Sequence, residues 1–438
     1  MQVFGVLFGV VLLFLLAYWG YPVLLVAPVC AIIVAAFNGM PLLETFTDTF
    51  MRGAGNSFTT LFGVLVLGGI LAELYKVSGG ATAIAKSLLR GSRKIFRAEG
   101  SVVAPILVIV VIGMVLCYGG INGVVGLVIM FPISLEIMKA NDLPRELAPG
   151  IIMGATCTAA MTMPGSPQSQ NVIPSLYLGT PSTAGLIPGL AGGLVTLALV
   201  VLFMTSAAKK ARAQGIGYTD PPSMPVQQRP ENELPNALVS TVPLVLVFVC
   251  YNLLHWDINI ALSVGDVLCI ALFWKQLGGL KGVPVHLGTG AADSCSLGAI
   301  VCFLSGFGAV VSATPAFTAI CQAVVNIPGP VTFKAFLAMA IVVGVAGSGP
   351  AGLMAGVPMF AETFGQLGLS MAAFHRIAAF TGTCLDTLPS NAGVNVASKL
   401  SGYSVKVTYR YCFLTTVLST TIGAVVVTVI LTIAPGLA

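Results

Sequence analysis

Met161-Thr-Met-Pro-Gly-Ser-Pro-Gln-Ser-Gln-Asn-Val-Ile-Pro174 is the stretch of sequence that decides the fold. It lies among long apolar segments, yet it contains three prolines, a glycine, two serines, two glutamines and an asparagine. Proline removes a backbone donor and clashes with the preceding helical turn, so the stretch predicts a break in a helix. A second stretch of this kind, Asp386-Thr-Leu-Pro-Ser-Asn-Ala-Gly-Val-Asn395, occurs in the other half of the chain.

The composition around the two breaks is typical of an integral membrane protein. Of the 438 residues, 57% are hydrophobic and 8% are charged, whereas soluble domains carry about 25% charged residues. The apolar segments have the length of helices and lack the alternation of β-barrel strands, so we predict an all-α polytopic membrane protein. Hydrocarbon offers no hydrogen-bond partners, so broken backbone at that depth must line a cavity or be buried in protein.

The apolar segments divide the chain into two halves of similar organisation. We expect spans at about 2–19, 21–37, 58–76, 101–118, 121–138 and 183–207, with a broken segment near 148–178. The second half predicts spans at about 237–255, 257–275, 294–313, 332–346, 350–366 and 408–434, with a broken segment near 371–400. Residues 1–207 and 237–438 are therefore predicted as transmembrane repeats, joined by a polar, proline-rich cytoplasmic linker over 208–236. Segment 2–19 lacks a basic leader and a cleavage site, and is predicted as a retained helix.

Four short sequence matches follow the same order in both halves, which indicates an internal duplication. Gly53-Ala-Gly-Asn-Ser57 matches Gly290-Ala-Ala-Asp-Ser294, and Leu67-Gly-Gly-Ile-Leu71 matches Leu304-Ser-Gly-Phe-Gly308. Gly119-Gly-Ile-Asn-Gly123 matches Gly347-Ser-Gly-Pro-Ala-Gly352, and Pro164-Gly-Ser-Pro-Gln168 matches Pro389-Ser-Asn-Ala-Gly393. Paired interruptions in two such repeats are typical of a transporter's binding site at the membrane midplane.

The charge pattern predicts that the two repeats have inverted topology. The loop after the third span carries Lys86, Arg90, Arg93, Lys94 and Arg97, which predicts a cytoplasmic location, and the linker begins with more cations. The equivalent loop of the second half, 314–332, carries no charge and is predicted outside. Both termini are then extracytoplasmic, in the inner or plasma membrane of a bacterium.

The polar side chains of the two breaks are the candidate substrate ligands. Helix N-termini that face a midplane cavity attract anions, and neutral donors can add to them. The candidates are Ser166, Gln168, Ser169 and Asn171 in the first break, and Thr387, Ser390, Asn391 and Asn395 in the second. The alternative is that these groups only cap the broken helices or join the two halves.

Ionisable residues inside the membrane are candidates for the coupling site, because each costs about 2.5–3.5 kcal/mol at mid-depth. We select Asp386, which precedes the second break, and Asp293, and we keep helix capping as the alternative for Asp386. Arg376 is a possible partner of a substrate carboxylate. Arg52, Glu73 and Glu362 fit interfacial positions.

The sequence argues against several other classes of protein. It contains no GxSxG, HExxH or Walker motif and no glycine-rich dinucleotide turn, so we predict no enzyme and no cofactor. Ten cysteines lie almost all in apolar segments without a CxxC pair, so we predict no metal site. The net charge of +5 comes from loop residues and gives no sign of nucleic-acid binding. An ion channel would need a ring of filter carbonyls supplied by an oligomer. An inverted repeat with two breaks fits alternating access better.

Three stretches of the chain resemble the gluconate:proton symporter family of the ion transporter superfamily. They are Arg52-Gly-Ala-Gly-Asn-Ser-Phe-Thr-Thr60 with Leu67-Gly-Gly-Ile-Leu-Ala-Glu73 and Ser78-Gly-Gly80, then Met163 to Pro174, and then Asp386-Thr-Leu-Pro-Ser-Asn-Ala-Gly393. The last two are similar to elements of the family's 3-hydroxybutyrate permease branch.

The resemblance implies two repeats with re-entrant hairpins that meet at a midplane site, in a homodimer that works by an elevator-like movement. It implies import of a small hydroxy- or monocarboxylate, such as 3-hydroxybutyrate, by proton symport. Gluconate or another sugar acid is the alternative substrate. That branch usually has histidine where this chain has Ser390, so sodium is the alternative coupling ion.

Overall fold

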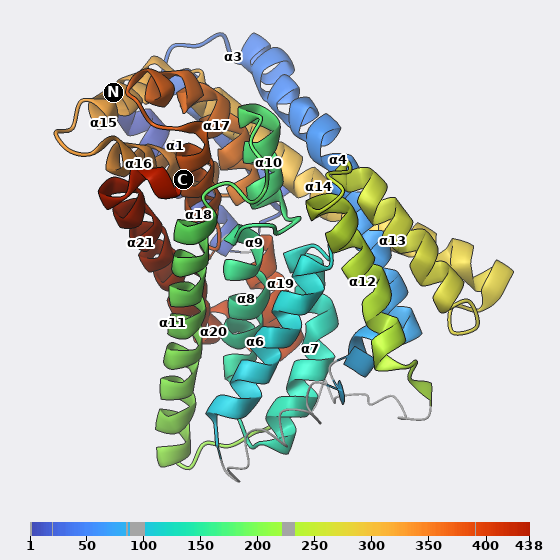
Figure 1. Ribbon diagram of the computed structural model, residues 1–438. Coiled ribbons are helices and arrows are strands. Elements are labelled where there is room, and N and C mark those ends of the chain that lie inside the picture. The colour runs from blue at the N-terminus through green and yellow to red at the C-terminus, as the bar shows by residue number, and fades with distance from the viewer. Residues whose placement is uncertain (1, 20, 85, 88–100, 221–232, 390) are drawn as a thin grey trace.

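The computed structural model describes residues 2–19, 21–84, 86–87, 101–220, 233–389 and 391–438. Within these ranges the regular structure is helical and no strand occurs, which confirms the all-α prediction (Figure 1). Ser390 and the loop cations Arg90, Arg93, Lys94 and Arg97 lie outside the described residues.

The helices of the first half come in an order that the second half repeats. The first half contains α1 (Gln2–Tyr18), α2 (Val23–Phe37), α3 (Leu42–Glu44), the π-helix η1 (Thr45–Phe50), α4 (Met51–Ser78), α6 (Val103–Tyr118), α7 (Gly123–Ala140), η2 (Arg145–Leu147), α8 (Ala148–Thr156), α9 (Ala159–Thr162), α10 (Ser169–Leu178) and α11 (Leu186–Ala213). The second half contains α12 (Ala237–Asn252), α13 (Ile258–Leu272), α14 (Gly279–Ser312), α15 (Pro315–Val325), α16 (Val331–Ala346), α17 (Gly349–Gln366), α18 (Met371–Cys384), α19 (Ala392–Ser401), α20 (Val405–Cys412), the π-helix η4 (Phe413–Leu418), α21 (Ser419–Ile433) and η5 (Pro435–Leu437).

Each half has two short helices, one long helix, a helix pair, a broken segment and a final long span. Thus α8 to α10 correspond to α18 and α19, and α11 corresponds to α20–η4–α21. The order of the helices is similar in the two halves, and both the duplication and the inverted orientation of the halves in the membrane stay predictions.

The long helices α4 and α14 form the spine of a panel on one side of the molecule (Figure 1). They pack along each other, α13 lies against α4 with α12 beside it, and α2 lies against α14 with α1 beside it. Glycine permits the close approach of the two spine helices. A Cβ at Gly290 would lie 2.8 Å from the Cα of Ile70 and 2.9 Å from the carbonyl oxygen of Gly69.

Both spine helices begin earlier than predicted. Helix α4 starts at residue 51 and not near 58, and α14 starts at 279 and not near 294. The polar residues at these starts were interpreted as loops, but tertiary packing keeps them helical. Gly53 lies against Ala309, and Gly306 lies against Phe50.

The remaining helices form a bundle beside the panel, and its centre holds the two broken segments. Helix α10 of the first half packs against α17 and α18 of the second half. Helix α19 of the second half packs against α7 and α8 of the first. Each broken segment is therefore enclosed by helices of the other half.

Several helices have the length and composition of membrane spans. Among the described residues, three helices are long and apolar enough to cross a bilayer, and the bent pair Leu42–Thr59 and Phe62–Ser78 makes a fourth span if counted together. Shorter apolar helices of 10–17 residues make up much of the rest. Both chain termini lie in the upper part of Figure 1, and α11 runs to its lower edge before the linker.

We expect Gly290→Ala to lower the thermal stability of the purified protein by about 1–3 kcal/mol, because the new methyl group has no room between α14 and α4. Thermal unfolding in detergent measures this. Gly288→Ala is the matched control two residues away, where a Cβ would meet nothing within 4 Å. Its stability should stay equal or rise by up to about 1 kcal/mol through helix propensity. Equal losses in both variants would contradict the close approach.

Candidate functional site: two broken segments

The first break runs from Cys157 to Gln168 and contains one short helical turn, α9. Extended backbone follows from Met163, and Gly165 adopts a φ of +79°, which favours glycine. Helix α10 then runs through Pro174, which the sequence predicted as part of the break. At this interior position the proline costs the helix one hydrogen bond, and the protein that surrounds α10 supports its continuation.

Arg376 of α18 joins the first break to the second half of the chain. Its side chain is fully buried and makes five hydrogen bonds. The guanidinium donates to the carbonyl oxygens of Thr162 at 2.5 Å, Ser182 at 2.8 Å and Ala184 at 2.6 and 2.8 Å, and to Oδ1 of Asn171 at 2.8 Å. None of its partners in the described chain is an acid, so its positive charge is met only by dipoles.

Asn171 is the centre of this contact. Its Nδ2 donates to the carbonyl oxygens of Met161 and Met163, each at 3.0 Å. Its Oδ1 accepts from Arg376 and lies 3.4 Å from Nε2 of His375, whose Nδ1 lies 2.7 Å from Oγ1 of Thr180. The predicted ligand Asn171 and the predicted carboxylate partner Arg376 thus bind each other and the broken backbone in this conformation.

Gln168 fixes the other end of the first break to the turn between α6 and α7. Its Nε2 donates to the carbonyl oxygens of Cys117 and Ile121, both at 2.9 Å. Its Oε1 accepts the N–H of Gly123 at 3.2 Å, which is the first residue of α7.

Asp386, at the start of the second break, makes a comparable contact. Its Oδ1 accepts the N–H of Gly349, the first residue of α17, at 2.8 Å. Asn391 supports it, since its Nδ2 lies 3.0 Å from the carbonyl oxygen of Asp386 and 3.3 Å from Oδ1. The two breaks therefore contact the same place in their own repeats, one with a neutral amide and the other with a carboxyl group.

The other second-break candidates hold the break in shape. Asn391 caps α19, because its Oδ1 accepts the N–H of Gly393 at 2.7 Å. Nδ2 of Asn395 donates to the carbonyl oxygens of Pro389 and Asn391 at 3.1 and 2.9 Å. Thr387 hydrogen-bonds to Thr416 in the π-helix η4, a type of helix often found at functional sites.

Two first-break serines also have local partners. Oγ of Ser166 donates to the carbonyl oxygen of Ala160 at 2.5 Å, and Oγ of Ser169 donates to Oε1 of Gln170 at 3.0 Å. Gln170 also contacts α18, because a Cβ at Gly382 would lie 3.4 Å from its Cγ. This contact brings α10 to α18 one turn before Asp386.

The remaining ionisable candidates lie away from the breaks. Asp293 is exposed within α14 on the panel. Arg52 pairs with Asp48, Glu73 pairs with Lys76, and Glu362 bonds Gln366 on an exposed surface. No group of three or more possible metal ligands occurs among the residues that the structure describes.

Some bonding capacity at the breaks remains open to a ligand. No side chain caps the N-terminus of α10, so its first N–H groups can meet an acceptor. In the described part of the chain, neither Oδ2 of Asp386 nor Oδ1 of Asn395 has a hydrogen-bond partner. The first break therefore offers donors and positive charge, and the second offers acceptors.

Sequence reasoning missed the backbone N–H groups of Gly123 and Gly349. Backbone donors carry no residue signature, but the glycine-rich turns before α7 and α17 were among the repeated matches, and that repetition was the available signal.

Comparison with known proteins places these features in context. Residues 1–263, more than half of the chain, match the family model described as "GntP family permease". A Bacillus subtilis (strain 168) protein named "Uncharacterized transporter YxjC" is 26% identical over 468 residues, which covers 96% of this chain and 97% of that protein. The crystal structure of the Alcanivorax borkumensis YdaH transporter is similar in fold, with a TM-score of 0.57 and 13% identity over 98% of this chain and 100% of that one.

We expect Asn171→Ala to destabilise the protein, because it removes a donor from the carbonyls of Met161 and Met163 and an acceptor from the buried Arg376 guanidinium. The Met163 carbonyl keeps the N–H of Ser166 as a second donor at 3.2 Å. Each buried group left unsatisfied costs about 1–3 kcal/mol. Thermal unfolding in detergent measures the effect. Ser169→Ala is the control in the same break, because it removes only a bond to the adjacent Gln170. A smaller loss in Asn171→Ala than in Ser169→Ala would contradict the central position of Asn171.

Proposed function

The chain belongs to the GntP permease family and is a membrane transporter, and on that premise we propose that it imports a small organic anion by proton symport. The observation that carries the proposal is the buried Arg376 guanidinium beside the uncapped N-terminus of α10. Carbonyl dipoles satisfy its donors but leave its charge in place. The first break therefore has a positive potential that favours a carboxylate.

The open acceptors of the second break support a hydroxy-carboxylate as the substrate. We propose that the carboxylate of the substrate binds at the N-terminus of α10 and that its hydroxyl group binds Asn395 or Asp386. Oδ1 of Asn395 and Oδ2 of Asp386 can each accept a hydrogen bond from a hydroxyl group. This arrangement suits a 3-hydroxybutyrate-like molecule, and a sugar acid such as gluconate is the alternative with more hydroxyl groups.

Asp386 is the group that we propose to carry the coupled proton. It is buried, titratable, placed at a break, and bonded through one oxygen to the N-terminus of α17. Sodium is the alternative, since carboxylate and carbonyl oxygens suit a hard cation. Asp293 is the second candidate, and it lies exposed on α14 of the panel.

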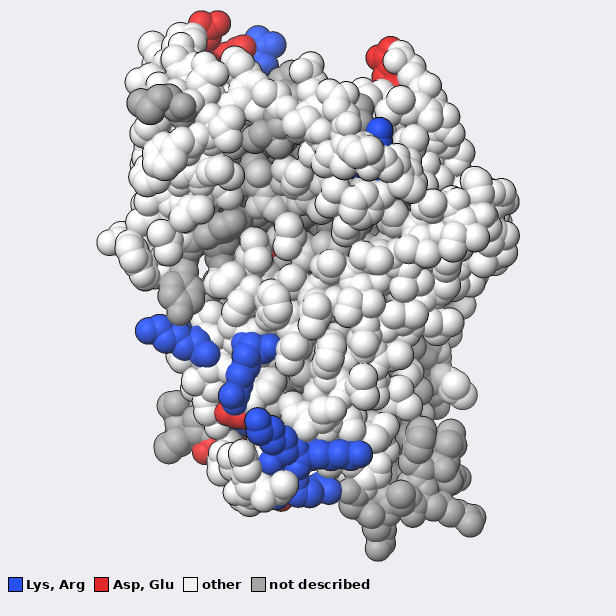
Figure 2. Space-filling view, turned by 90° about the vertical axis from the view of Figure 1, so that its left-hand side faces the viewer, with Lys and Arg blue, Asp and Glu red and all other residues white. Residues whose placement is uncertain are grey.

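The arrangement of the helices supports an elevator-like movement. The two broken segments interlock in one bundle, and the α4–α14 panel lies beside it. We propose that the bundle moves against the panel, and that a second copy of the chain binds the panel in a homodimer. Most of the Lys and Arg side chains visible in Figure 2 lie in the lower half of the face, which supports a cytoplasmic lower end and extracytoplasmic termini.

Proteoliposome uptake tests the substrate and the coupling ion. We expect labelled 3-hydroxybutyrate to accumulate at least tenfold under an inward proton gradient and to show no response to a sodium gradient. Labelled gluconate under the same gradients separates the two substrate classes. Accumulation of neither compound under either gradient would contradict carboxylate symport.

Replacement of Asp386 tests the coupling site. Asp386→Asn should remove accumulation driven by the proton gradient, because the amide cannot carry a proton, while exchange of internal for external substrate continues. Asp293→Asn in the same assay tests the second candidate. Concentrative uptake at the normal level in Asp386→Asn would exclude this residue as the coupling group.

A further inference from the structure

Two buried arginines make matching contacts on the two broken segments. Arg145, in η2 immediately before α8, is 2% exposed, and Arg376 in α18 is fully buried. Arg145 belongs to the first half and donates to carbonyls at the end of α19 in the second half. Arg376 belongs to the second half and donates to carbonyls in the loop that follows α10 in the first half.

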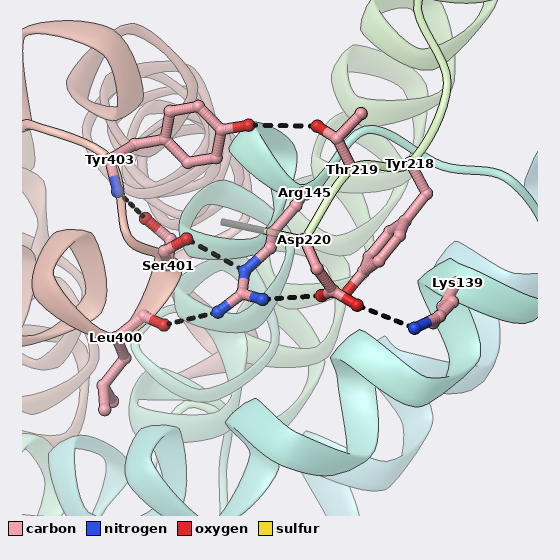
Figure 3. Close-up of polar contacts among 8 residues, drawn as sticks. All are labelled: Lys139, Arg145, Tyr218, Thr219, Asp220, Leu400, Ser401 and Tyr403. Carbon is pink, nitrogen blue, oxygen red and sulfur yellow. Dashed lines mark hydrogen bonds and ion pairs between the residues drawn. The ribbon is translucent and has the colours of Figure 1, made fainter. Parts of the chain in front are cut away.

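Figure 3 shows the contacts of Arg145. Its Nε lies 2.9 Å from the carbonyl oxygen of Ser401, and Nη2 lies 3.3 Å from that of Leu400. These are carbonyls of the last turn of α19, which lack partners within the helix and carry partial negative charge. Nη1 lies 2.8 Å from Oδ1 of Asp220, a residue of the linker.

The linker segment Gly217–Asp220, here called the strap, is bound at several points to the first half. Oδ2 of Asp220 pairs with Lys139 at 2.7 Å, and the Tyr218 hydroxyl donates to Oδ1 of Asp220 at 2.8 Å. The N–H of Tyr218 donates to Asp142 at 2.8 Å. Thr219 lies 3.5 Å, oxygen to oxygen, from the hydroxyl of Tyr403 just beyond α19.

We propose that Arg145 and Arg376 are reciprocal clamps that join the two broken segments into one rigid body, and that the strap stays bound to this body throughout transport. The proposal rests on the proposed function for its movement, but the clamps themselves are independent of the substrate. Each guanidinium presents donors in a fixed planar fork, so it holds two neighbouring carbonyls at once. Both side chains are buried, so water cannot readily replace the bonds that an opened clamp would lose.

The two clamps differ in how their charge is balanced. Arg145 has Asp220 as its acid, whereas Arg376 has no acid among its described partners. Hydrogen bonding from Lys139, with help from Tyr218 and Arg145, holds the pKa of Asp220 below its ordinary value of 3.8. A carboxyl group whose pKa is lower in the folded than in the unfolded protein stabilises the fold at pH values above its unfolded-state pKa. That stabilisation is lost as the pH falls through its folded-state pKa. The strap is therefore charged and bound throughout the neutral range.

Hydrogen exchange on the purified, substrate-free protein tests the clamps without reference to transport. We expect Arg145→Gln to speed exchange in the last turn of α19 at least tenfold and to leave 179–185 unchanged, whereas Arg376→Gln should do the reverse. Asp220→Asn should also speed exchange in the last turn of α19, but by less than Arg145→Gln does. Arg145→Lys keeps the positive charge but loses the planar arrangement of donors. It replaces Arg145→Gln in this experiment if the glutamine variant fails to fold. Equal or absent changes in both regions would overturn the reciprocal clamps.

Crosslinking tests whether the strap stays bound during transport. Cysteines at Thr219 and Tyr403 are joined by a short bifunctional reagent, in a background where Cys295 and Cys321 are serine. We expect the crosslinked protein to keep at least half the uptake of the same variant without crosslinker. Loss of uptake upon crosslinking, with uptake intact before it, would show a strap that opens in each cycle and would overturn this part of the proposal. Absence of uptake before crosslinking would count against the proposed substrate and not against the clamps.

Discussion

Broken helices in a membrane leave carbonyl and N–H groups that lipid cannot satisfy, and this constraint governs the centre of the molecule. The chain meets it by exchange between its halves. Arg376 of the second half binds the carbonyls of the first break, and Arg145 of the first half binds those at the end of α19. Packing follows the same pattern, with α10 against α17 and α18, and α19 against α7 and α8. Part of the backbone of each broken segment is therefore satisfied by side chains of the other half.

The two breaks carry different charges at comparable contacts. Gln168 and Asp386 contact the first N–H of α7 and of α17 respectively, yet one is a permanent amide and the other can ionise. The charge partners of the two arginines also differ. Arg145 pairs with the carboxylate of Asp220, whereas Arg376 has no acid partner in the described chain. One break therefore combines donors with positive charge, and the other combines acceptors with a titratable group. An exact repeat would not place a fixed positive charge in one break and a titratable carboxyl group in the other.

The sequence predicted most of the helices and the place of both breaks, because prolines and hydrophobic segments act locally. It missed the early starts of α4 and α14, where close packing at Gly53 and Gly290 keeps polar residues helical. It also named Asn171 and Arg376 without their mutual bond, because partners 205 residues apart leave no local pattern. Arg145 escaped notice because one arginine near a basic loop looks like any residue that sets membrane orientation. Its burial is visible only in three dimensions.

The positive charge of Arg376 is the main electrostatic feature of the first break. A buried, unpaired charge costs several kcal/mol, and dipoles offset only part of that cost. Replacing Asn171 by an acid would neutralise Arg376, but the donors from Nδ2 to Met161 and Met163 would be lost. The amide therefore keeps the backbone satisfied and leaves the positive charge available. This available charge is the basis of the proposed anion site, because a bound anion would balance it.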